Sequence, residues 1–166
     1  MRLFVAINFD EEIKGALKEV QNKMKLQGVR GNYTRPENLH LTLAFIGEYS
    51  DPGFVKEVVE GIRIAPFDIS LDGMGSFGNL WWVGIKKNDR LEVLARILRR
   101  RLAENDVPFD RKRFSPHVTL IRKPESAIPL SPNDYAGLVN GVSMTVDHIS
   151  LMRSDRGKNG MIYTEI

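Results

Sequence analysis

Two histidines lie in the same four-residue pattern at separate points of the chain. His-Leu-Thr-Leu begins at His40, and His-Val-Thr-Leu begins at His117. Successive side chains of a strand point to opposite faces, so each histidine would share a face with the threonine two residues later, Thr42 or Thr119. One neutral and one protonated imidazole can accept and donate a proton near pH 7, and threonine hydroxyls can donate hydrogen bonds to an anion. The patterns predict acid–base chemistry on an anionic centre.

Other kinds of catalysis find less support in the sequence. The chain has no cysteine, and neither histidine has a carboxylate at ligand spacing, so a zinc or iron site is not expected. No serine lies in a nucleophile-elbow sequence. The glycine-rich stretch 73–79, GMGSFGN, lacks the Lys-Ser/Thr ending of a phosphate-binding loop. We therefore predict a reaction without a metal or a cofactor.

An anionic centre that needs a base on one side and an acid on the other is typical of a phosphodiester undergoing in-line displacement. An unstrained phosphodiester is too unreactive for two histidines alone, whereas a 2′,3′-cyclic phosphate at an RNA end is strained and could be opened by them. The charge distribution suits such a polyanion, because residues 84–166 carry 15 Lys and Arg against 10 Asp and Glu, and residues 1–83 carry 9 against 11. The run Arg99–Arg101 taken alone is more typical of a solvated helix face.

Hydrophobic periodicity and Gly/Pro punctuation predict the order of the elements. Strands are expected at 3–9, 38–47, 67–72, 81–87, 115–122, 143–152 and 161–166, helices from a cap at Asp10 to Gly28 and over 54–63 and 89–104, and loops at 73–79 and 124–132.

The order of elements contains a repeat. Val5-Ala6-Ile7 and Val83-Gly84-Ile85 are 78 residues apart, and the two histidine patterns are 77 apart, with a helix in register between them. We predict an α+β fold, a bilobal pseudo-twofold repeat in which two mainly antiparallel sheets face a central cleft and the helices of each lobe cover the outer face of its own sheet. Each motif would lie on a middle strand. The whole of 1–166 would form one two-lobed domain, with the repeat at about 3–47 and 81–122.

The third histidine begins a similar string, His-Ile-Ser-Leu at residues 148–151. It lies outside the register of the repeat, and no third lobe exists to carry it. We therefore expect His148 to be structural or on the surface, with no part in catalysis.

The paired motifs resemble those of the two-histidine phosphoesterase superfamily. The likeness includes ENLH and FSPH before the threonines, Phe-Ile-Gly and Ile-Arg after them, RLFVAI near the start, GSFGNLWWVGI in the middle and LMRSDRGKNGMIYTEI at the end, with Ser154, Gly160 and Tyr163. The chain is most similar to the branch of RNA 2′,3′-cyclic phosphodiesterases formerly called 2′-5′ RNA ligases.

The resemblance implies specific roles for the site residues. His40 would be the proton donor and His117 the proton acceptor, while Thr42 and Thr119 would bind phosphoryl oxygens. Arg122 matches a basic residue that commonly follows the second motif, although strand parity places it on the face opposite His117 unless the strand ends or bulges first.

The implied reaction is metal-independent hydrolysis of RNA 2′,3′-cyclic phosphate ends to 2′-phosphomonoesters. Some members of the family also join RNA halves by ATP-independent 2′-5′ ligation, the reverse reaction. The substrate would be an RNA end such as that of a tRNA fragment, and we expect a cytoplasmic monomer without a membrane partner. Two alternatives stay open: a phosphodiesterase for a small nucleotide, such as ADP-ribose cyclic phosphate or a 2′-5′ oligoadenylate, and a non-catalytic RNA-binding module.

For three aromatic residues of the middle segment, the sequence leaves alternative roles. Phe77 could stack on a base or act as a lid over the core. Trp81 and Trp82 must point to opposite faces of their strand, so one of them should belong to the core.

Overall fold

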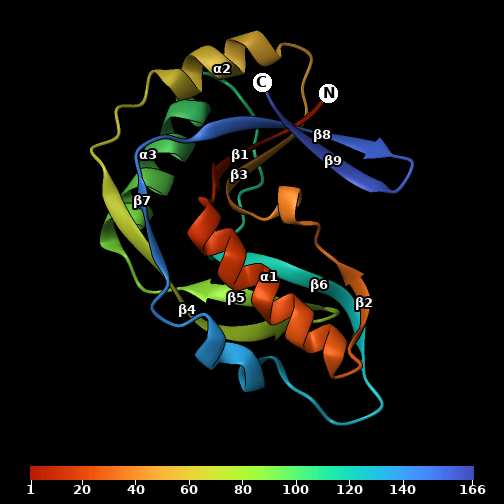
Figure 1. Cartoon of the computed structure of the whole chain (residues 1–166). Helices are drawn as coiled ribbons and strands as arrows, with labels where there is room; N and C mark the ends of the chain where they lie inside the picture. Colours follow the sequence, from red (N-terminus) through yellow and green to blue (C-terminus); the bar gives the residue numbers. More distant parts are fainter.

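The computed structural model describes residues 1–166 and contains two antiparallel sheets, three α-helices and two 3-10 segments (Figure 1). In chain order, the elements are β1 (Arg2–Asn8), α1 (Glu11–Leu26), β2 (Arg30–Tyr33), η1 (Pro36–Asn38), β3 (His40–Glu48), α2 (Pro52–Glu60), β4 (Phe67–Phe77), β5 (Leu80–Ile85), α3 (Asp89–Glu104), β6 (His117–Glu125), η2 (Pro132–Leu138), β7 (Ser143–Val146), β8 (Ser150–Gly157) and β9 (Gly160–Glu165).

The strands form two separate sheets. Sheet A has the strand order β3-β1-β8-β9, and sheet B has the order β2-β6-β5-β4-β7. The motif strands β3 and β6 pair antiparallel with β1 and β5, respectively. The predicted α+β fold with two antiparallel sheets is confirmed. The expectation that both motifs lie on middle strands is wrong for β3, which is an edge strand of sheet A, because β8 and β9 add to the other side of β1.

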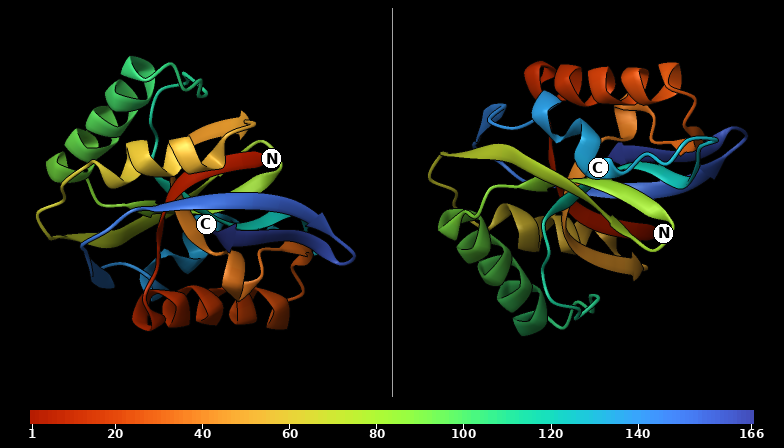
Figure 2. Two further views of the ribbon diagram at one scale, coloured as in Figure 1. Left: turned by 90° about the horizontal axis from the view of Figure 1, so that it is seen from above. Right: turned by 90° about the horizontal axis from the view of Figure 1, so that it is seen from below.

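The helices lie on opposite outer sides of the molecule, with α1 on one side and α2 and α3 on the other (Figure 2). Helix α1 follows a strand of sheet A but covers sheet B, where Gln21 donates hydrogen bonds to the backbone oxygens of Leu120 and Thr34 at 3.0 and 2.9 Å. Helix α3 follows a strand of sheet B but packs against β3 and α2. We expected each helix to cover the sheet of its own lobe, whereas the structure exchanges them. Hydrophobic periodicity predicts which face of a helix is buried, but it does not predict which sheet that face packs against.

One apolar cluster of 35 buried residues holds the two halves together. It joins the inner faces of the helices to the outer faces of both sheets, and fully buried side chains from each part include Leu17, Leu41, Leu98 and Val118. A second, smaller cluster of Phe4, Ala6 and Met152 lies on the opposite face of sheet A, next to Tyr163. The face of sheet A that bears His40 is therefore itself packed with aromatic and apolar groups.

A β-bulge interrupts each motif strand at the same place. In β3, Thr42 pairs with Ala6 and Ala44 with Val5, so Leu43 is the extra residue. The bulge increases the local twist and moves the side chains directly after it to the other face of the strand. Phe45 consequently returns to the face that carries His40.

The matching bulge in β6 has the same effect. Thr119 pairs with Trp82 and Ile121 with Trp81, which leaves Leu120 as the extra residue. The structure thus matches Ala6 with Trp82, 76 residues apart, so the spacing of 78 inferred from sequence similarity is wrong by two residues. A shift of two residues leaves each side chain on the same face of its strand, so the predicted faces of the motif residues are unchanged.

Two segments differ from the sequence-based expectation. Residues 73–79, predicted to be a loop, are mostly strand, because β4 continues to Phe77 and turns into β5 through Gly78 and Asn79. Gly73 has φ +74°, and the register shifts between Leu71 and Met74, so glycine here marks a bulge within the strand. The predicted strand 143–152 is two strands, β7 in sheet B and β8 in sheet A.

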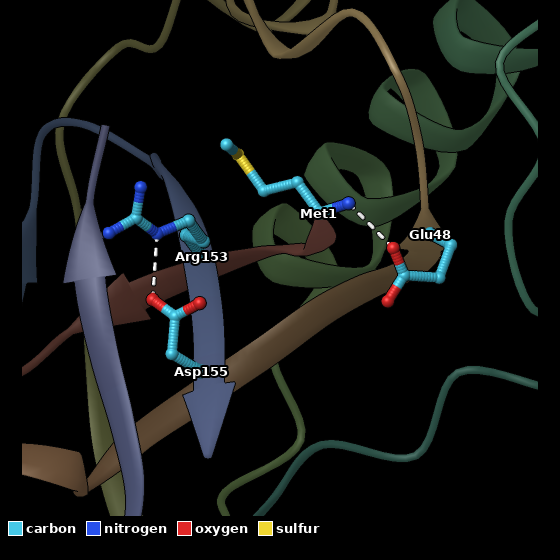
Figure 3. A network of polar contacts seen from close by, with 4 residues as sticks. All are labelled: Met1, Glu48, Arg153 and Asp155. Carbon is cyan, nitrogen blue, oxygen red and sulfur yellow. Dashed lines mark hydrogen bonds and ion pairs between the residues drawn. The ribbon is translucent and has the colours of Figure 1, made fainter. Parts of the chain in front are cut away.

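Two polar contacts lie at one end of sheet A (Figure 3). The amino group of Met1 forms an ion pair with Glu48, which joins the start of β1 to the end of β3. On β8, Arg153 Nε donates a hydrogen bond to Asp155 at 2.8 Å. None of the α-helices combines the length and apolar character needed to cross a membrane.

Candidate active site

Both histidine motifs line one cleft between the two sheets. The cleft has a volume of about 600 Å³, and His40, Thr42, His117, Thr119 and Arg122 all contribute to its wall. Strands β3 and β6, which carry the two motifs, contact each other. The structure thus brings together all five residues that the sequence singled out, although they come from two segments of chain about 77 residues apart.

The two imidazole rings are held in the same way. Nδ1 of His40 lies 2.7 Å from the carbonyl oxygen of Asn38, and Nδ1 of His117 lies 2.7 Å from that of Ser115. A carbonyl oxygen only accepts hydrogen bonds, so Nδ1 carries the proton in both neutral rings. Nε2 is therefore the atom of each ring that can take up or release a proton toward the cleft.

His40 lies in the more enclosed half of the cleft. Its ring centroid is 4.9 Å from that of Phe4 and 5.3 Å from that of Tyr163, which meets it edge-on at 90°. Its Nε2 lies 2.8 Å from Thr42 Oγ1. Burial lowers the pKa of His40 by disfavouring the charged ring, and the charge of His117 lowers it further, against the opposing effect of the Asn38 carbonyl.

The lowered pKa predicts an identifiable titration. In the free protein, the His40 ring should be half-protonated at a pH below its ordinary value of about 6.5. Inorganic phosphate bound in the cleft should move that midpoint upward, because a nearby anion favours the imidazolium. Following the imidazole C–H resonances by NMR between pH 4 and 9, with His40→Ala for assignment, measures both values. A midpoint at or above 6.5 in the free protein would contradict this account.

His117 has a different aromatic setting. Phe77 approaches its ring edge-on, with centroids 5.2 Å apart and planes at 84°, and Phe77 in turn leans on Trp82 at 5.0 Å. Trp82 pairs directly with Thr119 and so lies on the same face of sheet B as that threonine. Trp81 packs against the core near Tyr135, so it is the core member of the pair.

The bulges place one further side chain from each motif strand on the cleft wall. Arg122 is exposed and lies on the same face as His117, because the bulge at Leu120 reverses the strand parity. Phe45 holds the corresponding place in the first motif and is 56% exposed. The two halves of the cleft thus carry an arginine and a phenylalanine at equivalent positions.

Positive charge dominates the rim of the cleft. Arg2, Lys112, Arg113 and Arg122 line it, and none of them forms an ion pair. Asp110 is the one acidic residue of the wall. The rim can therefore attract the phosphates of a nucleic acid without first breaking salt bridges.

Arg99 also reaches the cleft, but it has a structural task. Its guanidinium donates a hydrogen bond to the backbone oxygen of Lys112 at 2.7 Å and longer ones of 3.4 Å to that of Leu43, the bulge residue of β3. It also lies over the rings of Phe109 and Phe114. Arg99 thus ties α3, the β3 bulge and the loop before β6 together, so it is not part of a freely solvated helix face.

His148 lies outside the cleft. Its ring is exposed, and Nδ1 contacts the carboxylate of its neighbour Asp147 at 2.6 Å. Nowhere in the chain do three or more His, Asp or Glu side chains gather in a group that could hold a metal ion.

A family model described as the 2′-5′ RNA ligase superfamily matches residues 9–158. The chain belongs to this superfamily. A relative named RNA 2′,3′-cyclic phosphodiesterase, from Thermotoga maritima, is 30% identical, over 98% of this chain and 91% of its own length. A relative of the same name from Thermus thermophilus is 32% identical, over 99% of this chain and 87% of its own.

Solved structures of the superfamily share the whole fold. The structure of Escherichia coli LigT complexed with 3′-AMP has a TM-score of 0.82 and 28% identity, and the match covers 99% of this chain and 94% of LigT. The agreement extends over both sheets, so the two-sheet α+β arrangement is that of the LigT-like members of the superfamily.

Sequence reasoning missed Phe45 as a cleft residue, and it gave Tyr163 only as part of the resemblance, without its contact with His40. Phe45 lies five positions after His40, just as Arg122 lies five after His117, so aligning the two motifs could have drawn attention to it. The contact of Tyr163 with His40 had no local signal, because β9 comes near β3 only through the order of strands in sheet A.

Proposed function

We propose that this protein hydrolyses RNA 2′,3′-cyclic phosphate ends to 2′-phosphomonoesters by paired-histidine acid–base catalysis. The observation that carries the proposal is the convergence of two imidazoles, each held through Nδ1 by a backbone carbonyl oxygen, on one cleft with an unpaired arginine and a positively charged rim. Relatives named RNA 2′,3′-cyclic phosphodiesterase, 30–32% identical over nearly the whole chain, support this substrate class.

In the proposed reaction, Nε2 of neutral His117 takes a proton from a water molecule as its oxygen bonds to phosphorus. The bond from phosphorus to the ribose 3′ oxygen breaks on the opposite side, and protonated His40 gives the Nε2 proton to that oxygen. One water is consumed, and the phosphate stays on the 2′ oxygen. The strain of the five-membered ring assists the step, so the protein has only to position the groups and move two protons.

The contact between His40 and Thr42 couples protonation to phosphate binding. When His40 is neutral, its Nε2 can only accept, so the Thr42 hydroxyl must donate to it across the 2.8 Å contact. When His40 is protonated, Nε2–H donates to Thr42 Oγ1, and the hydroxyl hydrogen becomes free to bind a phosphoryl oxygen. A bound phosphate therefore favours the protonated His40 that the reaction requires, which offsets the lowering of its pKa in the empty cleft.

Thr119 and Arg122 complete the proposed phosphate site from the other sheet. Thr119 lines the cleft, and its hydroxyl, which no other group of the protein engages, can donate to a phosphoryl oxygen. Arg122 can bind two phosphate oxygens through its planar guanidinium group. Hydrogen bonds and charge aimed at the developing transition state stabilise it more than the substrate, which is the condition for raising kcat.

Phe45 is the proposed support for the base of the terminal nucleotide, because it is an exposed aromatic ring on the same strand as His40. Stacking of a base on such a ring is worth about 1–3 kcal/mol. Phe45→Ala should raise KM for a 2′,3′-cyclic nucleotide by about tenfold and change kcat much less, since the ring does not touch the reacting atoms. Steady-state kinetics test this, with Phe45→Trp expected to retain the wild-type KM. A loss confined to kcat would rule out the stacking role.

The decisive experiment uses a short RNA that ends in a 2′,3′-cyclic phosphate, with EDTA present. We expect a 2′-phosphate product, identified by mass spectrometry and by its difference from a synthetic 3′-phosphate standard. A 3′-phosphate product would keep the enzyme class but exchange the roles of His40 and His117. If the RNA is bound but not cleaved, and small cyclic nucleotides are cleaved instead, the RNA substrate is wrong.

A further inference from the structure

We propose that Gln21 of α1 is a positioning residue of the active site, because it holds the bulge of β6 in the geometry that turns Arg122 into the cleft. This inference rests on the function proposed above, which assigns Arg122 to the phosphate site. Gln21 does not line the cleft, so it acts through the backbone of Leu120, the extra residue of the bulge.

Gln21 is the polar exception on the buried face of α1. It is 4% exposed, and its amide nitrogen donates two hydrogen bonds, to the backbone oxygens of Thr34 at 2.9 Å and of Leu120 at 3.0 Å. The other buried residues of this helix are all apolar, namely Ile13, Leu17, Val20 and Met24. An apolar side chain of similar length would avoid the cost of burying an amide. The amide is therefore placed for the backbone that it binds.

The two bonds of Gln21 do more than satisfy a buried carbonyl group. The oxygen of Leu120 already accepts a hydrogen bond from Thr34 N at 2.9 Å. Gln21 adds a second bond to that oxygen and one to the oxygen of Thr34, so its amide bridges the residue after β2 and the bulge of β6. Thr34, Thr119 and Arg122 all line the cleft. The bridge therefore fixes the backbone segments that carry cleft residues.

The other half of the molecule contains the same arrangement. Helices α1 and α3 have 16 residues each, and Gln21 and Arg99 are both the eleventh residue, counted from Glu11 and Asp89. Arg99 donates to the oxygen of Leu43, the extra residue of the β3 bulge, at 3.4 Å. Each helix thus follows a strand of one sheet and reaches the bulge in the other sheet. Two unlike side chains make the same contact at equivalent positions, so the contact itself is the shared feature.

The bridge affects the side chains after the bulge more than those before it. A bulge turns the strand only while its backbone geometry is held against regular pairing. Without Gln21, we expect β6 to adopt arrangements in which Arg122 leaves the face of His117. The His117 ring precedes the bulge and is held by the carbonyl oxygen of Ser115. The loss should therefore fall on the arginine and leave the imidazole in place.

The first test compares variants on a 2′,3′-cyclic mononucleotide. Gln21→Met keeps the length of the side chain but removes both hydrogen-bond donors. We expect it to lower kcat/KM by about tenfold or more in the otherwise wild-type protein, as a small misplacement within a site does. In the Arg122→Met background, the same change should lower kcat/KM by less than about twofold, because the group that Gln21 positions is gone. An equal loss in both backgrounds would overturn the positioning role.

Gln27→Met is the matched control, because it removes an amide from the same helix. Gln27 lies at the end of α1 and accepts a hydrogen bond from the hydroxyl of Tyr135 in η2, so its replacement loosens α1 without touching the β6 bulge. Its kcat/KM should stay within about twofold of wild type. A loss as large as that of Gln21→Met would mean that any weakening of α1 suffices, and the specific role of Gln21 would be wrong.

A second measurement needs no activity, so it separates failure of this inference from failure of the proposed hydrolysis. The chain has no cysteine, so Arg122→Cys and Phe45→Cys each introduce a single thiol at an exposed position, one in each half of the cleft. The reaction of a thiol with 5,5′-dithiobis(2-nitrobenzoate) follows its exposure, so adding Gln21→Met should slow the reaction at position 122 by about tenfold. The rate at position 45 should not change, because Arg99 holds the β3 bulge.

The outcomes of the thiol reaction are distinct. Equal rates at position 122 with and without Gln21→Met would overturn the inference. Faster reaction at both positions is the signature of general instability and would overturn it as well. If position 122 slows while kcat/KM of Gln21→Met stays at the wild-type value, Gln21 holds the bulge and the proposed role of Arg122 in the reaction is wrong.

Discussion

Replacing either His40 or His117 by alanine is expected to lower kcat for hydrolysis of a 2′,3′-cyclic phosphate by about 10²- to 10⁴-fold. Each change removes one of the two proton transfers, because Nε2 of each ring is the atom that faces the cleft. The two losses should be far from additive, since neither proton transfer is useful without the other. Single-turnover rates of the two single variants and the double variant measure this.

His148→Ala is the matched control, because it removes an exposed histidine that lies outside the cleft. Its kcat should stay within about twofold of wild type, as expected for a surface substitution. The rate of the wild type should also have a bell-shaped pH dependence, because one imidazole must be protonated and the other neutral. The alkaline limb of kcat/KM reflects loss of the proton from His40. Its midpoint should lie below pH 6.5, in keeping with the lowered pKa of this residue. A rate that rises steadily from pH 5 to 9 would refute the two-histidine scheme.

Arg122→Met is expected to cause the second largest loss, about 10²-fold or more in kcat/KM, the usual cost of removing one group that stabilises an oxyanion. The bulge at Leu120 places this side chain on the face of His117, where its charge can meet the phosphate. Using a 2′,3′-cyclic mononucleotide as substrate confines the effect to the reacting phosphate. Arg122→Lys should recover only part of the activity, because an ammonium group cannot bind two oxygens in the planar geometry of a guanidinium.

Arg96→Met is the control for charge alone, since Arg96 is exposed on α3 and lies outside the cleft wall. It lowers the net charge by the same amount and should change kcat/KM by less than about twofold on so small a substrate. If Arg122→Met behaves like Arg96→Met, the arginine acts only through the general charge of the rim, and its role in the phosphate site is wrong.

The β6 bulge decides where Arg122 lies. If the same sequence ran in strict alternation with no bulge, Arg122 would lie on the buried face that Leu120 and Ile121 now occupy, which is the conflict that the sequence alone left unresolved. Bulges depend on how the backbones of two paired strands fit together, so the sequence of one strand seldom predicts them. For the same reason, the sequence did not predict that Phe45 lies exposed in the cleft, since this position follows from the bulge at Leu43.

The sequence by itself determined most of the local elements and the motif residues. The alternation in His40–Leu43 and His117–Leu120 fixes which side chains share a face, because side chains in any strand repeat every two residues. Asp10 was recognised as the cap of α1, where its side chain accepts a hydrogen bond from the backbone of Ile13. The internal repeat predicted two similar halves, and the paired histidines predicted a shared site.

Only the tertiary structure decided how these parts meet. Strand order, the exchange of α1 and α3 between the sheets and the two matching bulges all depend on pairing between segments far apart in the chain. The lowered pKa of His40 depends on burial beside Phe4 and Tyr163, which β1 and β9 supply. Residue types and spacings state what chemistry is available, whereas burial, facing and distance are properties of the packed chain, and these decide which groups can act together.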